Sequence, residues 1–185
     1  MLQLKIAHRI KDTCKDIFAK LEMFYIVSAY ILVYGWRGKD KSVKKTTAKN
    51  IIIVGGELLN KGSQAMVFQT IDNLKREFAD KNIYLFSIFD YSQDDTKNLN
   101  YNFNIMLWNW EIKKGIFSRA INILTGNPNI KNSRKRLEEI IKNTAFFVDI
   151  SGYALSSQWS LKHCINYLLN IMIAKKFSIP YYIFP

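Results

Sequence analysis

The sequence has few of the residues that form the common reactive centres of enzymes. Its 185 residues include three prolines, two histidines and two cysteines, and Cys14 and Cys164 lie far apart with no metal-binding or redox motif around either. GxGxxG and the P-loop pattern are both absent, which argues against the ordinary dinucleotide and nucleoside-triphosphate sites. No Ser-His-Asp set, metal cluster or secretory signal is visible. We therefore expect a cytoplasmic protein with reduced cysteines, no metal and no bound cofactor.

Positive charge is concentrated near the N-terminus. The net charge is +12, and residues 1–49 carry eleven Lys/Arg against four Asp/Glu. These basic residues flank an apolar run, Met23 to Trp36, which is shorter than the ~20 residues that span a bilayer. The run is compatible with a helix that packs on protein, or with one that lies at a membrane surface. No nucleic-acid recognition module is visible, so we expect no nucleic-acid partner.

From residue 50 onward, strand-like and helix-like segments alternate. Strands are predicted at 51–54, 83–88, 103–108, 145–150 and 181–184, and helices at 62–78, around 116–124, at 131–142 and at 161–176. Asn127 and Pro128 are expected in a loop. The alternation predicts an α/β, Rossmann-like domain over residues 50–185 with a mainly parallel sheet, preceded by a basic leader over 1–49 with an apolar helix and a linker. Since a strand stands at the last residues, we expect a truncated domain of a larger protein.

The most informative stretch is residues 51–66, IIIVGGELLNKGSQAM. An uninterrupted β-branched run is typical of a buried parallel strand, and the helical spacing begins shortly after the glycines. The loop between them lies where a helix N-terminus can hold an anion. The candidate binding residues in this loop are Gly56, Glu57, Asn60, Lys61, Gly62 and Gln64. In the alternative interpretation Asn60 only caps the helix and Gly62 only allows a turn.

A second stretch, residues 145–159, AFFVDISGYALSSQW, repeats this arrangement. Asp149 ends an apolar strand, so its carboxylate must either reach solvent or accept hydrogen bonds from neighbouring groups. Ser151 and Gly152 follow, and Gly152 permits close approach of a ligand to the backbone. In the alternative interpretation Asp149 only ties down the turn. Trp108 is compatible with stacking on a sugar or base ring and with packing in the core.

These motifs carry a resemblance to a known family. Residues 54–66, VGGELLNKGSQAM, residues 148–159, VDISGYALSSQW, and residues 180–185, PYYIFP, resemble the amino-terminal half of the polysaccharide pyruvyl transferases. The resemblance covers about residues 50–185. The chain departs from the family pattern at two positions. Many members have an acidic or alanine residue where this chain has Ser63, and an acid is expected where it has Ser157.

The resemblance implies a function and a two-domain architecture. Members transfer the enolpyruvyl unit of phosphoenolpyruvate, their co-substrate, as a ketal onto two hydroxyls of a surface polysaccharide or its lipid-linked precursor. Their two Rossmann-like halves resemble the glycosyltransferase-B arrangement. Asn60, Lys61, Gly62 and Gln64 would line the cleft floor, with Asp149, Ser151, Gly152 and Tyr153 beside them. Asp149 is the candidate catalytic residue, as a sugar-hydroxyl acceptor or base. The groups that bind phosphoenolpyruvate would lie in the second half, so the chain alone is expected to be inactive.

Two other functions fit the same sequence. A nucleotide-sugar-dependent glycosyltransferase would have the same architecture. A non-catalytic binding protein would use residues 1–49 to associate peripherally with a membrane, at the inner face of the cytoplasmic membrane.

Overall fold

The structure is a computed structural model that describes residues 47–92, 101–117, 128–152 and 161–184, with a few residues nearer the N-terminus. The chain divides into two compact units, Met1–Asp40 and Lys41–Pro185. The described residues of the first unit are all helical: Thr13, Ile17, Lys20, Leu21, Phe24, Tyr25 and Ser28. No helix within the described part of the chain is long and apolar enough to cross a bilayer.

The second unit is built on five parallel strands. They are β1 (Asn50–Val54), β2 (Asn82–Ser87), β3 (Asn104–Leu107), β4 (Thr144–Asp149) and β5 (Tyr181–Ile183). Their order in the sheet is β3-β2-β1-β4-β5, and each neighbouring pair is parallel. The predicted Rossmann-like α/β fold is therefore confirmed for this unit. The order reverses between β1 and β4, which is the position where open parallel sheets bind their ligands.

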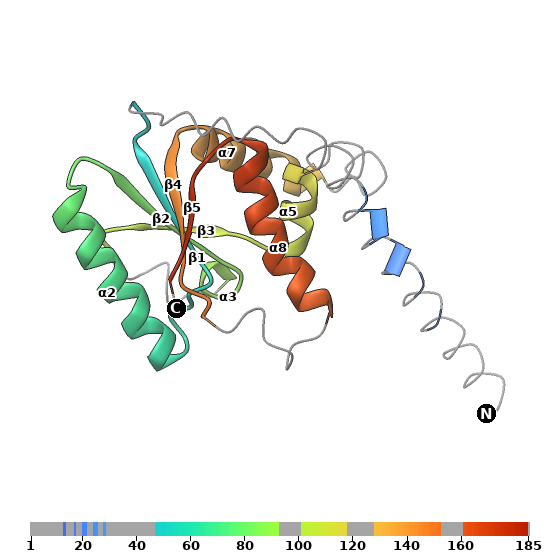
Figure 1. Cartoon of the computed structure of the whole chain (residues 1–185), viewed down its shortest axis with the longest axis horizontal. Helices are drawn as coiled ribbons and strands as arrows, with labels where there is room; N and C mark the ends of the chain where they lie inside the picture. Colours follow the sequence, from blue (N-terminus) through green and yellow to red (C-terminus); the bar gives the residue numbers. More distant parts are fainter. Residues whose placement is uncertain are drawn as a thin grey trace. The chain divides into compact units, whose positions relative to one another are not determined.

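Helices lie on both faces of this sheet. They are α2 (Lys61–Glu77), α3 (Phe89–Ser92), α5 (Trp110–Phe117), α7 (Pro128–Lys142) and α8 (Leu161–Lys176). Helix α2 lies on one face, and α5, α7 and α8 lie on the other (Figure 1). Every residue of β1 is buried, as a strand covered on both faces requires.

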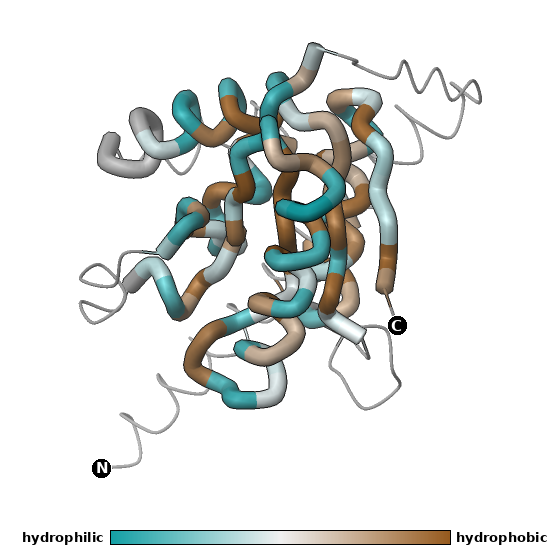
Figure 2. Tube along the Cα trace, turned by 90° about the vertical axis from the view of Figure 1, so that its left-hand side faces the viewer, coloured by the Kyte–Doolittle hydropathy of each residue, from teal (hydrophilic) through white to brown (hydrophobic). Residues whose placement is uncertain are grey.

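Side chains alternate between the two faces along each strand. Ile51 and Ile53 of β1 pack with Val67 and Ile71 of α2. In β4, Phe146 contacts Phe78 next to the end of α2, whereas the following residue, Phe147, stacks on Tyr181 of β5. Asp149 has the same parity as Phe147, and it therefore points toward the face covered by α5 and α8. Apolar segments run through the centre of the sheet in Figure 2.

Two predicted boundaries are wrong. A helix was expected around residues 116–124, but α5 occupies 110–117, and the rest of that prediction falls outside the described residues. Pro128 was expected in a loop, yet it is the first residue of α7. Proline is favoured at this position because its missing N–H would have had no partner within the helix.

Candidate functional site

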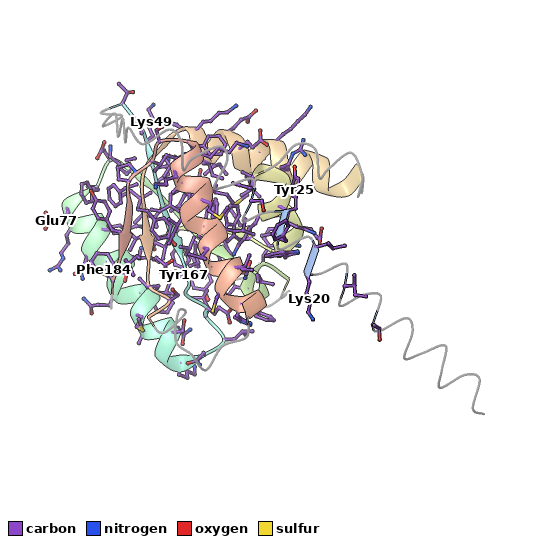
Figure 3. The ribbon with its side chains drawn as sticks, turned by 45° about the vertical axis from the view of Figure 1, so that its right-hand side comes forward. Lys20, Tyr25, Lys49, Glu77, Tyr167 and Phe184 are labelled. Atoms are coloured by element: carbon purple, nitrogen blue, oxygen red, sulfur yellow. The ribbon has the colours of Figure 1, made fainter. Side chains whose placement is uncertain are left out.

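The two motifs meet at the carboxyl edge of the sheet. Residues 55–60 follow β1 and residues 150–152 follow β4, which is the neighbour of β1. Gly55 has φ +81°, and a Cβ placed there would lie 2.5 Å from Ser151 Cβ and 2.8 Å from Asp149 Oδ1. The backbone of the first loop thus packs directly against the second. In Figure 3, Lys49 marks the start of β1 and Phe184 follows the end of β5.

Gly56 serves packing inside this junction. A Cβ at Gly56 would lie 2.5 Å from a Val67 methyl group and 2.6 Å from Ile150 Cδ1. Any larger residue would push α2 away from the sheet. The observed contacts therefore give Gly56 a structural role, whether or not a ligand also approaches it.

The N-terminus of α2 is capped by its own chain. Asn60 Oδ1 accepts hydrogen bonds from the N–H groups of Gly62, at 3.0 Å, and Ser63, at 3.3 Å. The Gln64 N–H donates to the carbonyl of Asn60 at 2.7 Å, and Ser63 Oγ accepts from the Glu57 N–H at 2.7 Å. These backbone donors are engaged by the chain itself. Two of the features expected to hold an anion here take no part in these hydrogen bonds. They are the ammonium group of the exposed Lys61 and the helix dipole.

A second carboxylate lies near Glu57. Asp90, at the start of α3 beyond β2, is fully buried and accepts the Leu58 N–H at 3.0 Å on each of its oxygens. Burial raises the pKa of Glu57, and the charge of Asp90 raises it further. The sequence did not reveal this pair because Glu57 and Asp90 belong to different motifs, which the adjacency of β1 and β2 brings together.

Asp149 is fully buried and accepts hydrogen bonds on both carboxylate oxygens. Oδ1 accepts from the Ser151 N–H at 2.8 Å and from the Ser151 hydroxyl, and Oδ2 accepts from the Tyr181 hydroxyl. Of the two arrangements predicted for this carboxylate, the structure has the hydrogen-bonded one. Ser151, which contacts Asp149, is half-buried, and the next residue, Gly152, is exposed.

Behind Asp149 lies a buried polar cluster that the sequence did not predict. The Trp108 indole N–H donates to Asn170 Oδ1 at 2.8 Å, and Asn170 in turn bonds the Tyr181 hydroxyl. Tyr167 of α8, labelled in Figure 3, shares a hydrogen bond with Ser151. Trp108 is 2% exposed, so it packs in the core and does not offer a stacking surface.

Burial raises the pKa of both tyrosine hydroxyls in this cluster. The charge of Asp149 raises the pKa of Tyr181 and of Tyr167 further, because a second negative charge beside the carboxylate is unfavourable. Both hydroxyls therefore keep their protons at neutral pH. At neutral pH both hydroxyls can therefore donate a hydrogen bond, and neither adds a second negative charge beside Asp149.

Lys113 of α5 places a cation in the same buried region. Its ammonium donates to Asn166 Oδ1 at 3.1 Å and lies 5.6 Å from the centre of the Trp108 ring. Burial lowers the pKa of Lys113 to about 7, and the charge of Asp149 opposes that shift. The buried cation and the buried carboxylate thus interact, which offsets part of the cost of removing both from water.

Some expected site residues contribute little or fall outside the description. Gly152 has φ +56°, a backbone conformation that favours glycine, and a Cβ there would meet no atom within 4 Å. Tyr153 lies among residues 153–160, outside the described part of the chain. Within the described ranges, no group of three His, Cys, Asp or Glu side chains is arranged to hold a metal ion.

The comparisons with known proteins returned no relatives. No protein-family model, no curated protein sequence and no solved structure matches this chain.

Proposed function

We propose that the chain is the amino-terminal, acceptor-binding portion of a polysaccharide pyruvyl transferase. The proposal rests on the three motifs that resemble this family and on one geometric observation. Gly55 in the first motif packs against Ser151 and Asp149 in the second, at the point where the strand order reverses. Motifs that are 94 residues apart, Gly55 to Asp149, thus form one surface at the usual ligand edge of a Rossmann-like sheet.

In this proposal each side of the edge has its own task. Ser151 and Gly152 contact the acceptor sugar, with Asp149 acting on the sugar through the Ser151 hydroxyl. Lys61 attracts the anionic phosphoenolpyruvate toward the N-terminus of α2. The arrangement supports these tasks because Ser151 and Gly152 are accessible whereas Asp149 is fully buried.

The proposed reaction needs a second domain. An acid protonates the methylene carbon of phosphoenolpyruvate, a sugar hydroxyl attacks the adjacent carbon and loses its proton, and a second hydroxyl displaces phosphate to close the ketal. Positioning of the reactants and electrostatic stabilisation account for most of the acceleration. We propose that a second Rossmann-like half, in a glycosyltransferase-B arrangement, supplies the acid and further groups that bind phosphoenolpyruvate.

A transfer assay on the full-length gene product tests this function. Incubation with phosphoenolpyruvate and the polysaccharide of the source organism should yield equal amounts of ketal and inorganic phosphate. Ser151→Ala should lower the rate by about tenfold or more, and Asp72→Asn, an exposed acid on α2, should leave it unchanged. Turnover of a UDP- or GDP-sugar without any use of phosphoenolpyruvate would instead identify a glycosyltransferase.

We also propose that the N-terminal unit associates peripherally with the inner face of the cytoplasmic membrane, where lipid-linked saccharides are available. Ile17, Leu21 and Phe24 are helical and exposed, and their spacing of four and three residues is that of one helix face. The excess of basic residues in 1–49 favours an anionic surface.

Flotation of the full chain with phosphatidylglycerol vesicles tests this association. The wild type should float at low salt and less at high salt. The double variant Leu21→Glu, Phe24→Glu should stay at the bottom, whereas Leu59→Glu, at an exposed apolar residue of the other unit, should float as the wild type does. Equal flotation of all three proteins would contradict the proposal.

A further inference from the structure

In the polar cluster behind Asp149, each hydrogen bond has a fixed donor and a fixed acceptor. An indole N–H can only donate and a carboxylate can only accept. Trp108 stands at one end of the hydrogen-bond chain and Asp149 at the other, with Asn170 and Tyr181 between them. The direction of every bond between these two ends is therefore determined.

The direction follows step by step. Because the single proton of the Tyr181 hydroxyl goes to Asp149 Oδ2, the Asn170 amino group must be the donor in the bond between Asn170 and Tyr181. The Tyr181 oxygen then accepts from Asn170, and its proton is directed to Asp149 Oδ2. Since Oδ1 of the same carboxylate takes the backbone N–H of Ser151, it is an acceptor as well.

This direction decides what Ser151 can offer to a ligand. A serine hydroxyl has one proton, and here that proton goes to Asp149 Oδ1. The oxygen of Ser151 retains its lone pairs. A ligand that approaches the half-buried Ser151 side chain therefore meets an acceptor of hydrogen bonds with a buried negative charge behind it.

We propose that Ser151 binds neutral hydroxyl donors, such as the hydroxyl groups of a sugar, and rejects anions, and that Trp108, Asn170 and Tyr181 are positioning residues for this selectivity. The ionised oxygens of phosphate and carboxylate groups have no proton to give to Ser151 Oγ, and the Asp149 charge repels both anions. This selectivity deepens the proposed function. The identification of the bound hydroxyl groups with those of the acceptor sugar rests on that function. The carboxyl edge of the sheet would then bind the sugar next to β4 and the anion next to Lys61.

The Lys113 ammonium supports this arrangement through its electrostatic interaction with Asp149. It is 4% exposed, and the electrostatic interaction between it and Asp149 is favourable. A buried carboxylate without a partner would be costly. Of the charged and titratable groups that act on the Asp149 region, the structure identifies Lys113 from α5, Tyr167 from α8 and Tyr181 from β5.

Ligand titrations of the 185-residue chain, followed by heteronuclear NMR, test the proposal. The probes are the methyl glycosides of glucose, galactose and mannose, and inorganic phosphate at matched ionic strength. We expect the Ser151 and Gly152 amide resonances to shift with at least one glycoside and not with phosphate. Equal shifts with phosphate, or no shift with any glycoside, would overturn the proposal.

Variants separate selectivity from folding. Asp149→Asn should reduce the ratio of glycoside affinity to phosphate affinity by about tenfold, because the charge behind Ser151 is lost. Tyr181→Phe should reduce the same ratio, whereas Tyr182→Phe, its exposed neighbour in β5, should not. An unchanged ratio in well-folded Asp149→Asn and Tyr181→Phe proteins would contradict the positioning role.

A spectroscopic signature is independent of any ligand. The Ser151 hydroxyl proton should exchange slowly and resonate downfield, and the signal should disappear in Ser151→Ala. Absence of such a resonance in the wild type would also overturn the proposal. If the selectivity is found but the full-length product makes no ketal, the proposed function fails and this inference survives. If ketal forms but phosphate competes at Ser151, the inference fails alone.

Discussion

Lys113 provides a quantitative prediction about stability. Its ammonium is buried against Asn166 and Trp108, and burial lowers its pKa from 10.5 to about 7. A lowering of this size means that the buried ammonium destabilises the folded chain by about 5 kcal/mol. This cost applies at pH values where the folded and the unfolded chain both hold the proton. The folded chain releases the proton near pH 7 and the unfolded chain near pH 10.5. Between these values the unfolded state binds more protons, so the contribution of Lys113 to stability rises with pH, by about 1.4 kcal/mol per pH unit.

Urea unfolding from about pH 6 to about pH 10 measures this slope. The comparison is between the wild type and Lys113→Met, which keeps an unbranched side chain, shorter by one atom, and removes the charge. The difference in unfolding free energy, wild type minus variant, should be flat below about pH 7 and then rise.

The contribution of Asp149 is tested in the same experiment. Because its charge raises the pKa of Lys113, Asp149→Asn should move the start of the rise to lower pH. Parallel curves for the wild type and Lys113→Met across the whole range would refute the reasoning, since they would mean that Lys113 has the same pKa in the folded and the unfolded chain.

Three further predictions concern the first junction. Gly56→Ala should destabilise the protein by about 1–3 kcal/mol in urea unfolding, because the added Cβ would lie 2.5 Å from a methyl group of α2. Gly62→Ala should cost less, because the nearest atom to a Cβ there lies 3.4 Å away. Equal losses of stability in the two variants would contradict this packing. Asn60→Ala should cost about 1 kcal/mol by the same assay through loss of the helix cap, and an unchanged midpoint would show that the cap contributes nothing. Asp90→Asn should lower the pKa of Glu57 in an NMR titration, whereas an unchanged or higher value would rule out the repulsion between them.

The strands were predictable because their composition leaves few alternatives. Uninterrupted runs such as Ile51 to Val54 suit a strand covered on both faces, and all five predicted strands lie within one residue of the observed ends. The start of α5 was missed because Trp110 to Phe117 mixes lysines with apolar residues at a spacing that shows no exposed charged face. Both lysines of that helix, Lys113 and Lys114, are in fact buried.

The site was predictable only in its position. Strand ends and glycines place the two junctions at one edge, as the contact of Gly55 with Ser151 bears out. The partners of Asp149 were not predictable, because Lys113 and Tyr181 come from elements 36 and 32 residues away in sequence and meet it only through the strand order. Nothing in the sequence around a lysine or a tyrosine distinguishes a buried partner from a solvated side chain.

Hydrogen–deuterium exchange of the protein, with and without phosphoenolpyruvate and the proposed acceptor polysaccharide, tests most directly whether the two junctions form one ligand edge. The account predicts that peptides covering residues 55–64 and 149–152 become protected together. Protection of only one of them, or protection of residues 47–50 and 80–82 at the opposite edge of the sheet, would contradict it.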